Sequence, residues 1–229
     1  MSAPTILTLV PARLGSKGWP GKNRLLWPYA KPRLGRPQDL IAVTTDDPEL
    51  SKLAAREGFL VIDRPPELAT DTAKMVDVVA HACHQLPPHD GLLVWQLTQP
   101  CRRRATMQRV IETWRNQRAR GTVVTVQRVP DHYVPQRTVQ VWANGMMVMN
   151  QDDAHRRQDA KPAYIRDGQA YLTTWRRALE RNWYHGLCTA VIEREPLPLP
   201  IDTEQDWQIA KAYLSAPKHQ PLTELSTSA

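Results

Sequence analysis

The stretch TILTLVPARLGSKGWPGKN, residues 5–23, joins an apolar run to a loop that is rich in glycine, proline and positive charge. The apolar residues at 6–10 have the length of a β-strand that is buried in a sheet. The loop at 11–23 carries three glycines and the cations Arg13, Lys17 and Lys22. A turn needs one or two such glycines or prolines and no cluster of cations, so this loop predicts an anion-binding site at the carboxyl end of the first strand.

Apolar runs of strand length alternate with helical patterns along most of the chain. Strands are expected at 6–10, 40–45, 59–63, 91–97, 122–129, 169–173 and 189–193. Helices are expected at 47–57, from a cap at Asp71 or Thr72 to about 85, and at 105–118, 175–181 and 202–214. This alternation predicts an α/β fold with a three-layer, Rossmann-like, mostly parallel sheet, which binds ligands at the carboxyl ends of its strands.

The segment at 130–165 interrupts the alternation. An Asn-Gly pair at 144–145 lies between two short apolar runs, 139–142 and 146–149, and predicts a β-hairpin that a polar stretch follows. We expect a single domain over residues 1–214, in which 130–165 form an inserted hairpin lobe suited to a lid or a subunit contact. Residues 215–229 lack periodic apolar positions, so we expect them to form a flexible tail.

The composition favours an anionic ligand. Lysine and arginine number 30 against 23 aspartates and glutamates, a net charge of +7, which suits a nucleotide, an acidic sugar or nucleic acid. No apolar run is long enough to span a membrane, and the first residues lack the pattern of a signal peptide. The three cysteines are not spaced in pairs, which indicates a reducing compartment without disulfides. We therefore expect a cytoplasmic protein without membrane contact.

Two common phosphate-binding motifs do not fit the loop at 11–23. A Walker loop has four residues between its glycines and then Lys-Ser/Thr. Here five residues separate Gly15 from Gly21, and Asn23 stands where the metal-binding hydroxyl belongs. A dinucleotide fingerprint, Gly-x-Gly-x-x-Gly, does not occur in the loop either. The phosphate-binding site that the loop predicts must therefore have another geometry.

Residues 13–23, RLGSKGWPGKN, resemble the signature loop of the CMP-sugar synthetases, the cytidylyltransferases that activate sialic acid and related nonulosonic acids. Further segments are similar to motifs of that family and come in the same order: VTTDD at 43–47, RPPELATDTA at 64–73, QLTQPCR at 96–102, DGQAY at 167–171 and PIDTEQDW at 200–207. On these motifs the chain is identified as a divergent member of the family, with the resemblance covering residues 5 to about 213.

This resemblance implies the transfer of CMP from CTP to an acidic sugar, with Mg²⁺ as cofactor and pyrophosphate as the second product. It implies catalytic roles for Arg13, Lys17, Lys22 and Asn23. It implies nucleotide binding by Gly15, Ser16, Arg64, Asp71 and Thr72. Candidate residues for binding the sugar and its carboxylate are Gln96, Thr98, Arg137 and Arg166. Asp202 would be the metal ligand, and the inserted lobe would reach across a homodimer.

Three departures from the family pattern affect the nucleotide or the metal. Pro200 replaces the first carboxylate of the metal-binding Asp-x-Asp pair, and Lys74 replaces a serine. The segment at 24–40, which would hold the family's first helix, has only 17 residues and is rich in proline and arginine. We expect that helix to be lost.

Two other functions stay open. A degenerate, non-catalytic nucleotide-binding protein of the same fold would bind CTP and release no pyrophosphate. A basic nucleic-acid-binding protein is suggested by the arginines at 102–120, although Arg102 belongs to the motif at 96–102 and the others are also typical of a solvated helix face. His81, Cys83 and His84 do not predict a metal site, because no second cluster supplies further ligands.

Overall fold

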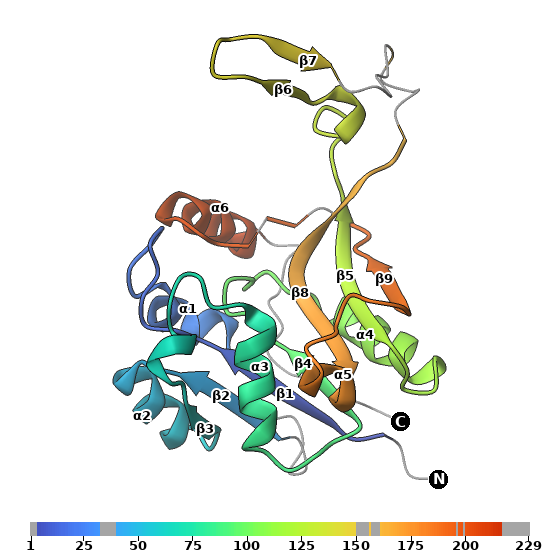
Figure 1. Cartoon of the computed structure of the whole chain (residues 1–229). Helices are drawn as coiled ribbons and strands as arrows, with labels where there is room; N and C mark the ends of the chain where they lie inside the picture. The colour runs from blue at the N-terminus through green and yellow to red at the C-terminus, as the bar shows by residue number, and fades with distance from the viewer. Residues whose placement is uncertain are drawn as a thin grey trace.

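A seven-stranded sheet, in the order β3-β2-β1-β4-β8-β5-β9, forms the centre of the computed structural model (Figure 1). Its strands are β1 (Ile6–Pro11), β2 (Ile41–Thr45), β3 (Leu60–Asp63), β4 (Gly91–Val94), β5 (Thr122–Arg128), β8 (Tyr164–Thr174) and β9 (Cys188–Ile192). Neighbouring strands are parallel except where β8 pairs with β4 and β5. The structure describes residues 4–32, 40–149, 156, 161–195, 197–198 and 200–216.

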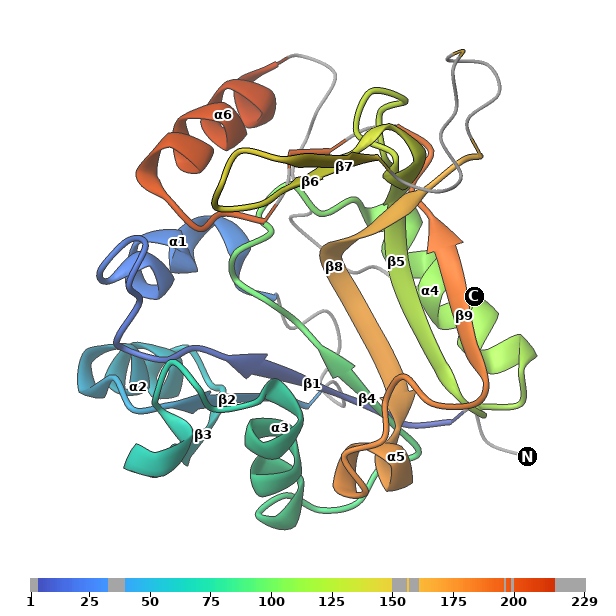
Figure 2. The ribbon, with the colours of Figure 1, turned by 45° about the horizontal axis from the view of Figure 1, so that its top comes forward.

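Helices pack on both faces of the sheet (Figure 2). One face carries α3 (Met75–His84) and α5 (Trp175–Leu179), and the other carries α1 (Lys22–Ala30), α2 (Pro48–Arg56), α4 (Arg104–Asn116) and α6 (Glu204–Ser215). Successive residues of β4 serve the two faces in turn, with Leu92 in the core beneath α3 and Leu93 in the opposite core. Each such side chain contributes about 1.5–3 kcal/mol by leaving water. The predicted three-layer, mostly parallel fold is confirmed.

The segment that we expected to lose its helix contains α1, so that expectation was wrong. The helix has nine residues and begins at Lys22, inside the predicted loop, after Gly21 adopts a φ of 71°. Leu26 and Trp27 are buried in the core, and their burial outweighs the cost of Pro28 in the helix. The indole Nε1 of Trp95 donates to the carbonyl oxygen of Ala30 at 2.6 Å and anchors the helix end.

Two boundaries near the candidate site also differ from the predicted ones. Lys74 occupies the N-cap position of α3, so neither Asp71 nor Thr72 caps that helix. Strand β8 begins at Tyr164, earlier than the predicted 169, because its first residues pair with the end of β5 while their side chains stay exposed. The residues at 164–168 mix apolar and charged side chains and end in a glycine, so no strand pattern indicated this extension.

The predicted hairpin is present as β6 (Val139–Val141) and β7 (Met147–Met149), which form a separate two-stranded sheet. Gly145 at the turn has a φ of 82°, and the Asn144 side chain accepts a hydrogen bond from the Met146 N–H at 3.0 Å. Figure 1 shows the hairpin standing clear of the main body beyond the ends of β5 and β8. We call residues 130–149 the hairpin lobe.

The predicted polar stretch at 152–161 and the predicted tail at 215–229 lie almost wholly outside the described residues. Within the described ranges, no helix combines the length and apolar character needed to cross a membrane.

Candidate functional site

The loop between β1 and α1 is fixed by hydrogen bonds to the strand beside it and to its own backbone. The N–H of Leu14 donates to the Asp46 carboxylate, at the end of β2, at 2.8 Å. The side-chain amide of Asn23 donates to the carbonyl oxygen of Arg13 at 2.9 Å, and Asn23 is buried. Asn23 therefore joins the first turn of α1 to the loop, which gives the cations of the loop defined positions.

Gly18 is the point where this loop comes closest to the segment that leads into α6. A Cβ added at Gly18 would lie only 2.6 Å from the backbone carbonyl oxygen of Asp202. At Gly15, in contrast, an added Cβ would meet nothing within 4 Å. Gly18 thus permits the loop and Asp202 to adjoin, whereas Gly15 faces open space.

Asp71 holds two of the predicted phosphate-binding cations. Its carboxylate lies 2.6 Å from an Nη of Arg13 and 3.0 Å from the Nζ of Lys17. Hydrogen bonds from Lys17 and Arg13 lower the pKa of Asp71 below its usual value. Arg13 and Lys17 thus converge on one anionic group, here the carboxylate of Asp71.

The third cation of the loop, Lys22, pairs with the candidate metal ligand. Its Nζ lies 2.8 Å from the carboxylate of Asp202 and 3.2 Å from the carbonyl oxygen of Ile201. The Lys22 side chain is only 12% exposed, while that of Asp202 is 79% exposed. Lys22 therefore has a fixed position at the start of α1, and Asp202 is free to exchange its partner.

The remaining predicted nucleotide-binding residues lie around the same edge of the sheet. Arg64, at the end of β3, is buried and donates one hydrogen bond to the carbonyl oxygen of Thr44 at 2.8 Å, while its Nε has no partner. Burial lowers the pKa of Arg64 to about 10, although nearby Asp46 opposes the shift. Thr72 is exposed, and its hydroxyl lies 3.3 Å from that of Thr70.

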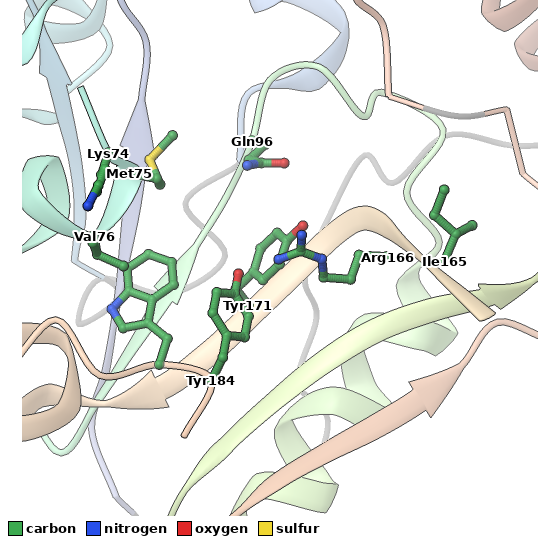
Figure 3. Close-up of a pocket in the computed structure, with 9 residues that line it drawn as sticks. Lys74, Met75, Val76, Gln96, Ile165, Arg166, Tyr171 and Tyr184 are labelled. Carbon is green, nitrogen blue, oxygen red and sulfur yellow. The ribbon is translucent and has the colours of Figure 1, made fainter. Parts of the chain in front are cut away.

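A pocket of about 620 Å³ contains two of the predicted sugar-binding residues, Gln96 and Arg166 (Figure 3). The other lining residues are Lys74, Met75, Val76, Ile165, Tyr171, Trp183 and Tyr184. The Arg166 guanidinium lies over the Tyr184 ring, 5.1 Å from its centre. Burial raises the pKa of Tyr171 to about 12 and also raises that of Tyr184, so both phenols stay protonated. The pocket thus offers hydrogen-bond donors, positive charge and an aromatic surface.

Sequence reasoning missed part of this lining. Trp183 and Tyr184 lie in the loop after α5, outside every motif, and only the adjacent pair of aromatic residues could have drawn attention to them. Lys74 was noted as a departure from the family pattern and not as a lining residue.

Arg102 forms the structural support behind Gln96. It is buried, its guanidinium lies 3.9 Å from the centre of the Trp95 ring, and burial lowers its pKa to about 9. Its Nε donates to the carbonyl oxygen of Gln169 and an Nη donates to that of Gln96, each at 2.6 Å. Arg102 therefore ties the segment after β4 to β8, the two pieces of chain that supply Gln96 and Arg166.

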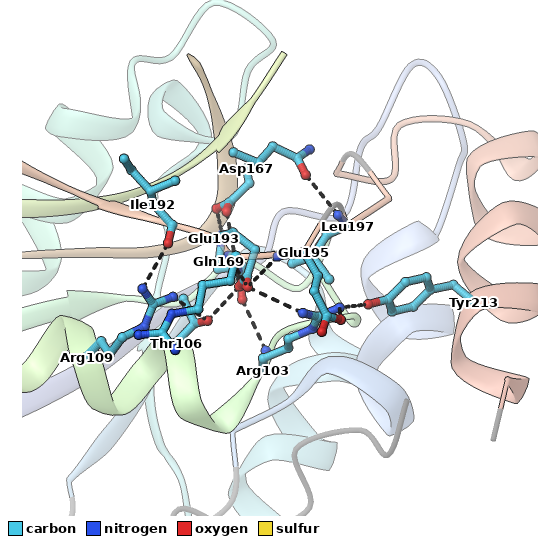
Figure 4. Close-up of polar contacts among 12 residues, drawn as sticks. Arg103, Thr106, Arg109, Asp167, Gln169, Ile192, Glu193, Glu195, Leu197 and Tyr213 are labelled. Atoms are coloured by element: carbon cyan, nitrogen blue, oxygen red, sulfur yellow. Dashed lines mark hydrogen bonds and ion pairs between the residues drawn. The ribbon is translucent and has the colours of Figure 1, made fainter. Parts of the chain in front are cut away.

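Buried polar contacts hold the neighbouring part of β8 in place (Figure 4). Asp167 accepts hydrogen bonds from the Thr125 hydroxyl at 2.5 Å and from the backbone and side chain of Gln169. Glu193 accepts from Thr106 at 2.6 Å and from Gln169 at 3.0 Å. Burial alone would raise the pKa of Glu193, but these hydrogen bonds lower it overall. The network makes the base of Arg166 rigid.

Gly168 brings Pro200 into this site. Its φ is 74°, and a Cβ there would lie 2.9 Å from the Cγ of Pro200 and 3.2 Å from the side-chain oxygen of Gln96. Pro200, which replaces the family's carboxylate, therefore packs on the glycine between Arg166 and Gln169.

Two predicted sugar-binding residues are not among those that line the pocket. The backbone of Thr98 accepts a hydrogen bond from the Ile201 N–H at 2.7 Å, which places the segment before Asp202. Arg137 is exposed at the base of the hairpin lobe. The structure thus brings Gln96 and Arg166 together and leaves Thr98 and Arg137 outside their pocket.

Asp202 is suited to a metal ion for which the protein supplies only some of the ligands. Within the described part of the chain, no three His, Cys, Asp or Glu side chains are grouped as metal ligands. Mg²⁺ commonly binds one or two carboxylates together with substrate phosphates and water. A single exposed carboxylate next to the cationic loop fits this pattern.

His81 and Cys83, which did not predict a metal site, have other surroundings. His81 is hydrogen-bonded to Gln85 at 2.8 Å, and burial raises the pKa of Cys83 to about 12.

A cationic loop at the carboxyl end of β1 thus lies next to a pocket at the end of β4, the edge of the sheet at which α/β proteins of this architecture bind their ligands. The family model for cytidylyltransferases matches residues 7–173, and the chain belongs to that family. The membership that the sequence motifs predicted is confirmed.

Two curated relatives and one solved structure are similar to this chain over most of its length. N-acylneuraminate cytidylyltransferase of Streptococcus agalactiae serotype V is 25% identical over 88% of this chain and 51% of its own, so this chain spans about half of that relative's length. CMP-N,N'-diacetyllegionaminic acid synthase of Legionella pneumophila is 26% identical over 91% of this chain and 96% of its own. The structure of CMP:2-keto-3-deoxy-manno-octonic acid synthetase complexed with CTP covers 92% of this chain and 98% of that chain, with a TM-score of 0.64 at 16% identity, which is a likeness of fold.

Proposed function

We propose that this chain is a cytidylyltransferase that transfers CMP from CTP to an acidic sugar and releases pyrophosphate. One observation carries the proposal: the loop after β1 gathers Arg13, Lys17 and Lys22 around carboxylates that a triphosphate can replace. An acceptor in the pocket of Gln96 and Arg166 would lie at the same edge of the sheet, as transfer between the two substrates requires.

In this reaction an acceptor hydroxyl oxygen bonds to the α-phosphorus of CTP, and the bond from that phosphorus to the bridging oxygen breaks as pyrophosphate leaves. Both substrates are anions, so the main barrier is electrostatic and fixed cations lower it. Among the described residues that line the pocket there is no carboxylate or histidine, and its phenols hold their protons. We therefore assign the hydroxyl proton to water, and assign charge stabilisation to Arg13, Lys17 and Lys22.

Mg²⁺ is the proposed cofactor, and when bound it would neutralise charge on the triphosphate. Asp202 would hold it on the protein side. Because Asp202 is paired with Lys22, phosphate must first draw Lys22 away, so the chain alone should bind the ion weakly.

A homodimer is proposed through the hairpin lobe. Its exposed side chains include Val141, Trp142, Met146 and Met147, which water solvates poorly. Arg137 lies at the base of this lobe, so its proposed role toward a sugar carboxylate depends on contact with a second copy. Light scattering after size exclusion should give the dimer mass, and a monomer at micromolar concentration would contradict the proposal.

The expected loss of the first helix and the presence of Pro200 both suggested the non-catalytic alternative. Because α1 is present, only Pro200 still supports that alternative. The nucleic-acid alternative is not favoured either. Arg102 is buried, Arg103 pairs with Glu195 at 2.9 Å, and Arg109 donates to the Ile192 carbonyl oxygen at 2.9 Å. These arginines brace the fold, so the expectation of a solvated helix face was wrong for Arg103 and Arg109, whereas Arg102 was assigned to the motif at 96–102.

Pyrophosphate release tests the proposed function. The full chain is incubated with CTP, Mg²⁺ and, one at a time, sialic, pseudaminic, legionaminic and 2-keto-3-deoxy-manno-octonic acids. Release that needs both CTP and one acid supports transfer. CTP binding without release for any acceptor would favour the non-catalytic alternative.

A further inference from the structure

The pocket beside the nucleotide loop carries more positive charge than one carboxylate requires. Lys74 and Arg166 both line it, and none of the lining residues that the structure describes is acidic. A single bidentate arginine is sufficient to bind a sugar carboxylate. A second anionic group on the ligand would therefore give the second cation a partner.

The Lys74 side chain has no ion pair or hydrogen bond within the described part of the chain, although its backbone carbonyl accepts hydrogen bonds at the start of α3. The acidic residues nearest to it along the chain are committed to other cations, since Asp71 bridges Arg13 and Lys17 and Asp77 pairs with Arg181 at 2.8 Å. The Lys74 side chain is exposed and forms no capping hydrogen bond at the start of α3. Its charge is therefore available to a ligand in the pocket.

Arg166 is available in the same way. The neighbouring carboxylate, Asp167, is fully buried and bonded to Thr125 and Gln169. Arg166 instead lies over the ring of Tyr184 and makes a side-chain hydrogen bond to it, which holds the guanidinium and leaves its other N–H groups to reach a ligand. Figure 3 shows Arg166 near Tyr171 and Tyr184, with Lys74 at the other side of Gln96. The two cations thus reach the pocket from different sides.

We propose that the acceptor carries two acidic groups: a carboxylate that binds Arg166 and a second anionic group, phosphate or carboxylate, that binds Lys74. This inference rests on the proposed function, because it concerns the acceptor of that reaction. Tyr171, Trp183 and Tyr184 cover the less polar face of the sugar between the two charges. The net charge of +7 suits a protein that holds a triphosphate and a dianion together.

Matched probes that differ by one phosphate test this proposal. Calorimetry compares N-acetylneuraminic acid with its 9-phosphate, and 2-keto-3-deoxy-manno-octonic acid with its 8-phosphate, on the full chain. In at least one pair the phosphorylated probe should bind about fivefold to tenfold more tightly, since it adds one charge-assisted contact in a partly exposed site. In Lys74→Gln the ratio should fall to within about twofold, and Lys52→Gln, an exposed lysine on α2, should keep the wild-type ratio.

Equal affinity for both members of each pair, or no binding by any probe, would overturn the proposal. So would an unchanged ratio in Lys74→Gln. If Lys74→Gln weakens CTP binding instead, Lys74 serves the nucleotide and the proposal is again wrong. CTP titrations on the same samples distinguish failure of the proposed function from failure of this inference. Absence of CTP binding defeats the proposed function. Equal CTP turnover with monoanionic and dianionic acids defeats only the inference of a dianionic acceptor.

Discussion

Replacing Gly18 by alanine tests whether the cationic loop and the segment with Asp202 form one site. The new Cβ would lie 2.6 Å from the Asp202 carbonyl oxygen, against at least 3.4 Å for ordinary contact, so the two backbones must separate by about 0.8 Å (3.4 − 2.6). Overpacking of this size costs about 1–3 kcal/mol, which lowers the Tm of a chain of this length by roughly 3–9 °C. A shift of this order between reacting groups lowers kcat/KM by about a hundredfold.

Pyrophosphate release measures kcat/KM, and a thermal melt measures the Tm. The matched control is Gly15→Ala in the same loop, where a Cβ meets nothing within 4 Å, so its Tm should equal that of the wild type. CTP affinity of Gly18→Ala should stay within about threefold, because the loop keeps all its cations. If Gly18→Ala shows wild-type kcat/KM, the loop and Asp202 do not act together and the proposed site is wrong.

Four further substitutions test single contacts of the site. Asp202→Asn should abolish pyrophosphate release and leave CTP affinity within about tenfold of the wild type. Lys22→Ala should weaken CTP binding more than Asp202→Asn does. Near-full activity of Asp202→Asn would refute the metal assignment. Asp71→Asn should bind inorganic pyrophosphate about fivefold more tightly in calorimetry, because Arg13 and Lys17 lose a competing carboxylate, and weaker binding would count against this competition. The pKa of Asp71 is lowered in the fold, so its ion pairs stabilise the chain above its unfolded pKa, and this stabilisation is lost as pH falls through the folded pKa. The free energies of unfolding of Asp71→Asn and wild type, measured by chemical denaturation, should therefore differ near pH 7 and converge in acid. A difference that persists in acid would contradict the ion pairs. Arg102→Lys should raise KM for the acceptor by a larger factor than it lowers kcat, since it loosens Gln96. A lower Tm with no larger effect on KM than on kcat would indicate a purely structural role.

The centre of the sheet could be predicted because β1, β2 and β4 are buried almost throughout and appear as continuous apolar runs. The run at 91–97 illustrates this pattern, although the strand itself ends at Val94. Helix α1 was missed for the opposite reason. Its sequence contains Pro28 and follows a glycine-rich loop, and only the tertiary burial of Leu26 and Trp27 makes it a helix.

The cationic loop could also be predicted, because three cations and three glycines directly after a strand have few structural explanations. The partners of those cations could not. Asp71 and Asp202 are far from the loop in sequence and meet it only through the order of the sheet and the start of α6. The aromatic side of the pocket was hidden for the same reason, since Trp183 and Tyr184 come from a loop without any motif.

Calorimetric titration of CTP into the full chain tests the central claim most directly, because every later step depends on the loop after β1 binding a triphosphate. We predict saturable binding of one CTP per chain in the wild type. Removal of one charge-assisted contact in Lys22→Ala should weaken it by about tenfold to a hundredfold, as expected for a loss of about 1.5–3 kcal/mol. No detectable CTP binding by the wild type, or equal affinity in Lys22→Ala, would contradict the account.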